Sequence, residues 1–203
     1  MRLVESVQHK IAVAGRITDA QTGNPVAGAQ VQMTDMPAAF AEYVALKALQ
    51  FGAAWSSMLN RPDCTQTAVD GAFYFLDLPA GVYTFTVSLS SLGSRYGVVA
   101  ATRVVPSNDV ADLYVTADVA LPPTTITGVV TDQSAAAVSM AKVQLVGSGE
   151  FTFADGDGRY ALTGVEAGNR TIKISAKGFQ TSFLPVTLAD AGAVQTLDVV
   201  LSQ

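Results

Sequence analysis

An internal repeat is the feature of this sequence that most limits the fold. Four blocks occur twice in the same order: residues 13–19 (VAGRITD) and 126–132 (ITGVVTD), 29–33 (AQVQM) and 141–145 (AKVQL), 70–81 (DGAFYFLDLPAG) and 157–168 (DGRYALTGVEAG), and 116–121 (TADVAL) and 196–201 (TLDVVL). Apolar and polar residues alternate within the blocks, as in β-strands that bury one face. The repeat therefore predicts two similar β-rich domains in tandem.

The residues between the blocks support short strands joined by tight turns. Glycine and aspartate recur there, at positions where a turn needs a positive φ or a capping side chain. Pro122 and Pro123 follow the last block of the first copy and would end its last strand. With 203 residues, the chain has room for two domains of about 100 residues each. We predict antiparallel β-sandwiches over residues 1–121 and 122–203.

The order of the blocks resembles the carboxypeptidase regulatory-like domain family. The resemblance rests on the Gly and Asp of the first block, the alternating second block, the Asp-Gly-x-aromatic third block, and Lys177-Gly178-Phe179 after the next strand. It implies a transthyretin-like (prealbumin-like) fold, so the expected fold class is all-β, with two tandem seven-stranded antiparallel β-sandwiches. The first copy departs from the pattern after Ser90, where residues 92–97 (LGSRYG) replace the Lys-Gly-Phe motif.

Charge and composition limit the possible partners. Apolar residues make up 49 % of the chain and charged residues 14 %, which argues against disorder. The net charge is −5 and the sequence has no basic cluster, so we expect neither nucleic acid nor an anionic membrane surface as a partner. The N-terminal residues contain no apolar segment of signal-peptide length. We therefore expect synthesis in the cytoplasm without a signal peptide, with the protein belonging to a particle or an exported assembly.

Catalytic and metal-binding patterns are scarce. His9 is the single histidine and Cys64 the single cysteine, which excludes zinc-peptidase and histidine-rich iron chemistry as well as an intrachain disulfide. The sequence around Ser148 lacks the spacing of a nucleophile elbow. Asp155 and Asp157 begin like a calcium loop, but the rest of such a loop is missing and a turn is the alternative. We expect no enzyme, no catalytic residues and no cofactor.

An insertion distinguishes the first copy from the second. Gly15 and Gly128 are 113 residues apart, whereas Gly71 and Gly158 are 87 apart, so the first copy carries 26 extra residues. We place the insertion at residues 36–62 and predict a helix over about 36–60, with Thr34 or Asp35 as N-cap, Pro37 in the first turn and a bend at Gly52.

The helix is apolar on more than one side. On a helical wheel Phe40, Val44, Ala48, Phe51, Trp55 and Met58 form a stripe, and Leu46 and Leu49 lie on the opposite face. The stretch from Ala48 to Asn60 is uncharged but has only 13 residues, below the ~20 that span a bilayer, which argues against a membrane role. Two interpretations remain open: the helix packs only on its own domain, or one face also binds a protein partner or a second copy through residues 37–59. The predicted partner-binding residues are Phe40, Leu46, Leu49, Phe51, Trp55 and Met58.

These observations predict a non-enzymatic structural or adaptor subunit of a larger protein assembly, such as a phage-tail-like or surface machine, anchored by the inserted helix. The alternative is a ligand-binding or adhesive module that recognises carbohydrate or a cell surface. Exposed aromatic side chains would favour the alternative, and the sequence offers Tyr96, Tyr114 and Phe151 as candidates.

Overall fold

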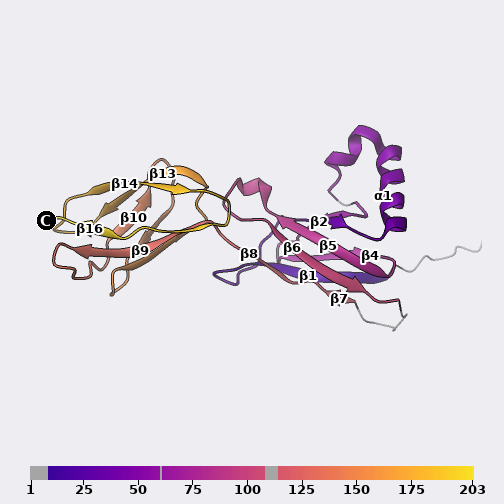
Figure 1. The fold of residues 1–203 in the computed structure, drawn as a ribbon, viewed down its shortest axis with the longest axis horizontal. Helices are drawn as coiled ribbons and strands as arrows, with labels where there is room; N and C mark the ends of the chain where they lie inside the picture. The colour runs from indigo at the N-terminus through magenta and orange to yellow at the C-terminus, as the bar shows by residue number, and fades with distance from the viewer. Residues whose placement is uncertain (1–8, 60, 108–113) are drawn as a thin grey trace, which may run out of the picture. The chain divides into compact units, whose positions relative to one another are not determined.

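The structure, a computed structural model, describes residues 9–59, 61–107 and 114–203 (Figure 1). The chain forms two compact units. Unit 1 comprises Met1–Leu89 and Val99–Leu121, and unit 2 comprises Ser90–Val98 and Pro122–Gln203. The sequence placed all of residues 1–121 in the first domain, whereas the contacts group Ser90–Val98 with unit 2.

Unit 1 contains two sheets of four strand segments each. One sheet has the order β4-β1-β7, with β8 also paired to β1, and the other has the order β3-β2-β5-β6. The segments are β1 (Ile11–Asp19), β2 (Gln30–Asp35), β3 (Cys64–Gln66), β4 (Ala72–Leu76), β5 (Gly81–Ser88), β6 (Val99–Val105), β7 (Val115–Thr116) and β8 (Val119–Leu121). β7 and β8 are two parts of one interrupted strand, which gives a seven-stranded sandwich.

Unit 2 repeats this arrangement, with sheets β12-β9-β15 (β16 also paired to β9) and β11-β10-β13-β14. Its segments are β9 (Thr125–Asp132), β10 (Lys142–Leu145), β11 (Phe151–Phe153), β12 (Arg159–Thr163), β13 (Gly168–Ser175), β14 (Ser182–Leu188), β15 (Val194–Thr196) and β16 (Val199–Leu201). Two tandem all-β sandwiches are thus confirmed. The sheets are not purely antiparallel, however, because β7 and β8 run parallel to β1, and β15 and β16 run parallel to β9. The last strand of each unit follows β6 or β14 of the opposite sheet, and such a crossover permits parallel pairing with β1 or β9.

Alternating burial produces one core in each unit. In unit 1 the fully buried side chains include Ile17, Phe85 and Leu121. In unit 2 they include Ile126 and Ile172. Their strand neighbours point outward and are polar or half-exposed, as the alternation predicts.

The last strand of each unit is interrupted at the same place. A Cβ on Gly15 would lie 2.5 Å from the carbonyl oxygen of Ala117, and one on Gly128 would lie 2.0 Å from that of Leu197. The next residue, Asp118 or Asp198, turns its carboxylate to the first strand of the unit. There Asp118 accepts the N–H of Arg16 at 2.8 Å, and Asp198 accepts the N–H of Val129 at 2.9 Å. These repeated residues are therefore required by the backbone geometry.

The predicted helix is present and shorter than expected. α1 spans Ala38–Phe51, and the 3₁₀-helix η1 follows over Gly52–Ser57. A bend was predicted at Gly52; α1 ends there instead, and the φ of 56° at Gly52 is one that glycine adopts at little cost. The predicted N-cap is wrong: Pro37 precedes the first helical residue and the helix has no side-chain cap. Asp35 still belongs to β2, and its carboxylate accepts the N–H of Met36.

Candidate functional site

The first turn attaches α1 to the sandwich of unit 1. Phe40 is 7 % exposed, and its ring meets that of Tyr83 edge-on, with the ring centroids 5.9 Å apart. Pro37 packs so closely on Gly81 that a Cβ there would lie 2.3 Å from the proline Cγ. Phe40 therefore anchors the helix to the core and is not available to a partner.

Beyond this turn α1 is largely uncovered. Figure 1 shows it standing away from the strands of unit 1 over most of its length. Leu46 is 66 % exposed, Leu49 80 % and Phe51 43 %. We call these three side chains the α1 surface. Their exposure leaves apolar area in water that association would bury.

The chain that returns from the insertion contains a buried ion pair and is bonded to β2 through its main chain. Arg61 Nε lies 3.1 Å from Asp63 Oδ1, and both side chains are less than a tenth exposed. The Arg61 guanidinium also lies over the Trp55 ring at 5.1 Å, and the ring of Phe51 stacks on Trp55 at 6.1 Å. The main chain of Asp63 accepts the N–H of Met33 in β2. The insertion is thus fixed at both ends, and its exposed apolar residues lie between them.

The structure separates the six predicted partner-binding residues into groups. Leu46, Leu49 and Phe51 form the exposed α1 surface, and Phe40 is buried. Trp55 and Met58 are half-buried. In the part of the chain that the structure describes, no helix is long and apolar enough to cross a membrane.

An open cavity of about 690 Å³ lies in unit 1 between the edge strands β3 and β4, beside α1. Cys64 and His9 both line it. Cys64 is buried and its Sγ contacts the Gln30 amide at 3.3 Å, whereas His9 forms an ion pair with Asp77. The hydrogen bond from His9 holds the pKa of Asp77 below its ordinary value. The thiol and the imidazole therefore have different partners and do not form a nucleophile–base pair.

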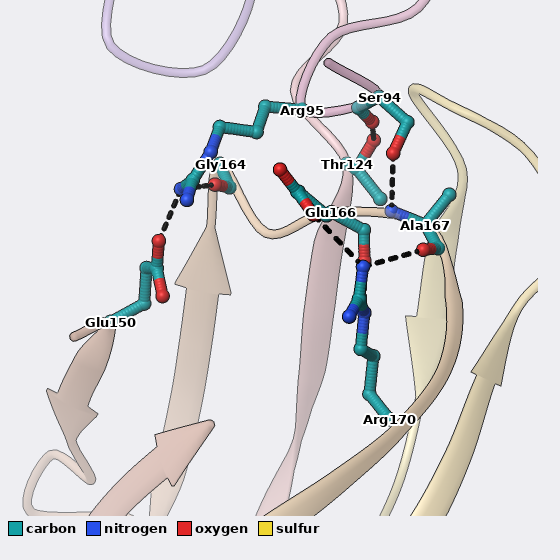
Figure 2. A network of polar contacts seen from close by, with 8 residues as sticks. All are labelled: Ser94, Arg95, Thr124, Glu150, Gly164, Glu166, Ala167 and Arg170. Carbon is teal, nitrogen blue, oxygen red and sulfur yellow. Dashed lines mark hydrogen bonds and ion pairs between the residues drawn. The ribbon is translucent and has the colours of Figure 1, made fainter. Parts of the chain in front are cut away.

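A polar network attaches Ser90–Val98 to the rest of unit 2 (Figure 2). Arg95 forms an ion pair with Glu150, and its guanidinium donates to the carbonyl of Gly164 at 2.7 Å. Thr124 donates its backbone N–H to the carbonyl of Arg95 and its hydroxyl to that of Ser94, each at 2.8 Å. The Ser148 hydroxyl and, to a smaller extent, Arg95 lower the pKa of Glu150. The network therefore involves the segment of the first copy that departs from the Lys-Gly-Phe pattern.

Arg170, in β13, completes the network by contacting the connection between β12 and β13. Its guanidinium lies 3.0 Å from the Glu166 carboxylate and donates to the carbonyl of Ala167 at 2.9 Å. The N–H of Ala167 in turn donates to the Ser94 hydroxyl at 2.9 Å (Figure 2). The charged groups are therefore used in structural contacts within unit 2.

The calcium candidates form a turn. Asp155 Oδ1 accepts the N–H of Asp157 at 2.9 Å and the N–H of Arg159 at 2.8 Å. This use of the carboxylate matches the alternative that the sequence left open. Within residues 9–59, 61–107 and 114–203, no three His, Cys, Asp or Glu side chains converge on one point.

Of the aromatic candidates, Phe151 and Tyr114 are each 52 % exposed, and Tyr96 is half-buried. Sequence reasoning missed Phe153 and Phe183, which are 47 % and 59 % exposed. For Phe183 the signal was present in the sequence, since it is out of phase with the apolar residues of its strand. Phe153 alternates with Thr152, so the local pattern would place it on the buried face.

Comparison with known families identifies one of the units. Residues 125–202 match the carboxypeptidase regulatory-like domain family. Unit 2 contains a carboxypeptidase regulatory-like domain. The match confirms the resemblance found in the second copy, and unit 1 shares its strand order. No curated protein matches the sequence.

Several solved structures are weakly similar to the chain. A chain of a type II cohesin–X-dockerin complex from Acetivibrio cellulolyticus is 19 % identical, with a TM-score of 0.33; the similarity covers 38 % of this chain and 56 % of that one. The Bacillus anthracis TIE protein is 13 % identical, with a TM-score of 0.42, 94 % of this chain covered and 34 % of that one. The shaft pilin SpaA from Lactobacillus rhamnosus GG is 13 % identical, with a TM-score of 0.39 and coverage of 95 % and 98 %. The chain thus spans about half the length of the first of these structures and a third of the second.

Proposed function

We propose that this protein is a non-catalytic structural or adaptor subunit that joins a larger protein assembly through α1. The observation that supports this proposal is the uncovered helix: Leu46 and Leu49 are 66 % and 80 % exposed, although the insertion is fixed to unit 1 at both ends. A rigidly attached apolar helix loses little conformational freedom on binding, so most of the burial energy would contribute to affinity.

The size of the effect can be estimated from apolar burial. Complete burial of one leucine side chain contributes about 1.5–3 kcal/mol. Leu46 and Leu49, three residues apart on one helix face, would form the centre of a helix-in-groove interface. The partner is another protein or a second copy of this chain. A phage-tail-like or surface machine is the kind of assembly that we propose.

The test measures the mass of the full chain by light scattering, both purified and in native extract. We expect a complex larger than the monomer, and we expect L46E/L49E to leave a folded protein that no longer associates. Circular dichroism and the thermal midpoint would show that the variant is folded.

A matched control is available in the same unit. V69E/V104E introduces the same two charges at positions that are 88 % and 62 % exposed but distant in sequence from α1. This control should associate like the parent chain. A free monomer in both preparations, or association that survives L46E/L49E, would show that the proposal is wrong.

A further inference from the structure

The outer face of the sheet β11-β10-β13-β14 in unit 2 carries an unusual set of side chains. The inward residues of these strands, such as Val143, Ile172 and Leu188, form the core. The outward residues include three phenylalanines and two lysines. We call this surface the Phe–Lys face and define it by Lys142, Gln144, Phe151, Phe153, Lys173 and Phe183.

Strand register places four of these side chains in one row across the sheet. Gln144 is opposite Phe151 on one side and Lys173 on the other, and Lys173 is opposite Phe183. At ~4.8 Å between strands the row is roughly 14 Å long. Its two ends are aromatic rings that are 52 % and 59 % exposed, and its middle is an amide and an ammonium group.

The lysines lie close to the rings. The Lys142 ammonium is 4.6 Å from the centroid of Phe151, and that of Lys173 is 6.0 Å from Phe183. These contacts hold positive charge against the aromatic surface. None of the four strands contains an aspartate or glutamate, although the chain as a whole has a net charge of −5. The Phe–Lys face is therefore a positive aromatic surface on an acidic protein.

Unit 1 shows that the fold does not require these residues. By strand pairing, Gln30, Thr86 and Ala100 occupy the positions of Lys142, Lys173 and Phe183. The outer face there is stabilised by threonine hydroxyl pairs, such as the contact between Thr34 and Thr86 at 3.0 Å. Since the same sheet folds with glutamine, threonine and alanine at these positions, the aromatic and charged residues of unit 2 are not required by the sheet.

We propose that the Phe–Lys face binds an anionic polysaccharide, a sugar chain that carries carboxylate groups. The apolar C–H faces of sugar rings would stack on Phe151 and Phe183 at the ends of the row. Carboxylates would pair with Lys142 and Lys173, and sugar hydroxyls would bond to the Gln144 amide. The charge complementarity favours an anionic chain over a neutral one. This binding would be independent of association through α1.

Affinity electrophoresis of the full chain tests the proposal, with polygalacturonate, dextran or polyglutamate in the native gel. We expect retardation by polygalacturonate alone, decreasing as salt screens the lysine contacts. F151S/F183S and K142Q/K173Q should each weaken the binding at least tenfold. Thermal unfolding of each variant would show that it is folded.

Matched controls show whether binding depends on the Phe–Lys face or only on positive charge and exposed aromatic rings in general. K47Q/K177Q removes two positive charges elsewhere, and Y74S/Y114S removes two exposed aromatic rings of unit 1. Both controls, and L46E/L49E, should bind polygalacturonate like the parent chain. No retardation by polygalacturonate, equal retardation by dextran, or equal loss in the controls would overturn the proposal. Retardation by polyglutamate alone would assign the face to an acidic protein instead.

Discussion

The two units share a backbone and differ at their surfaces. Gly15 and Gly128 allow the same close approach of the last strand, and Gly71 and Gly158 have φ values of 76° and 75°. The differences lie in the 26-residue insertion of unit 1 and in the outer sheet faces. The comparison separates residues that both sandwiches share from features that only one of them carries, such as the insertion and the Phe–Lys face.

The shared glycines should give the largest effects. In G128A the new Cβ would lie 2.0 Å from the Leu197 carbonyl oxygen, and in G15A 2.5 Å from that of Ala117. Each substitution should destabilise its own unit by about 3 kcal/mol, because the backbones must separate. Hydrogen exchange read peptide by peptide would measure the loss in each unit.

Gly149 provides the control for these substitutions, since a Cβ there would meet no atom within 4 Å beyond its chain neighbours. G149A should change stability by less than about 0.5 kcal/mol. If G15A and G128A were equally mild, the close approach of the last strand would not be what requires the glycines.

A substitution at Arg95 tests whether Ser90–Val98 belongs to unit 2. Arg95 precedes β6 of unit 1 in the sequence, but its ion pair with Glu150 and its bond to Gly164 lie in unit 2. R95A should therefore destabilise unit 2 by about 2 kcal/mol, because hydrogen bonds to charged groups contribute that much. Hydrogen exchange of β11 and β12 should rise while that of unit 1 stays unchanged.

Arg103 is the matched control, because its guanidinium donates to the carbonyl of Thr116 within unit 1. R103A should raise exchange in unit 1 only.

The pH dependence of the stability of unit 2 provides a second measurement of the contact between Arg95 and Glu150. The pKa of Glu150 is lowered in the folded protein, so its contribution is present above the ordinary pKa and is lost as pH falls through the folded value. R95A should make this acid-dependent loss smaller.

Substitutions on the edge strands β4 and β12 should have the smallest effect on stability. β4 reads Ala-Phe-Tyr-Phe-Leu, without a charge or proline, and its Tyr74 is 58 % exposed. Strand β12 has Arg159 at its start and Ala161 at the position of Tyr74. A lysine on an edge strand opposes strand-to-strand association, so Y74K should slow heat-induced aggregation.

A161K is the matched substitution in unit 2 and should leave the aggregation rate unchanged. Both variants should keep the free energy of unfolding within about 0.5 kcal/mol of the parent. Light scattering during heating would compare them. Equal effects of Y74K and A161K would mean that the two edges are equivalent.

Much of the fold could be predicted because its signals are local. Alternating residues predicted the strands, and Gly52 predicted a bend at the position where α1 ends. The parallel pairing of β7 and β8 with β1 could not be predicted, since strand direction within a sheet depends on a crossover between sheets. The N-cap of α1 was missed because Thr34 and Asp35 continue β2 and its hydrogen bonds.

For the candidate sites too, local features could be predicted from the sequence, whereas contacts between distant residues could not. The helical wheel predicted Leu46 and Leu49 as an outer face but could not show that Phe40 alone would be buried, because burial depends on Tyr83 in β5. Phe151 was noticed as an exposed aromatic candidate. Its row with Gln144, Lys173 and Phe183 required the strand register.

The sequence by itself determined that this protein consists of two β-sandwiches and that the first carries an α-helical insertion, since repeats and periodicity are properties of neighbouring residues. The tertiary structure decided that Ser90–Val98 belongs to unit 2 and that one sheet face gathers three phenylalanines and two lysines. Both results depend on contacts between residues far apart in the chain, and such contacts form only when the sheets assemble.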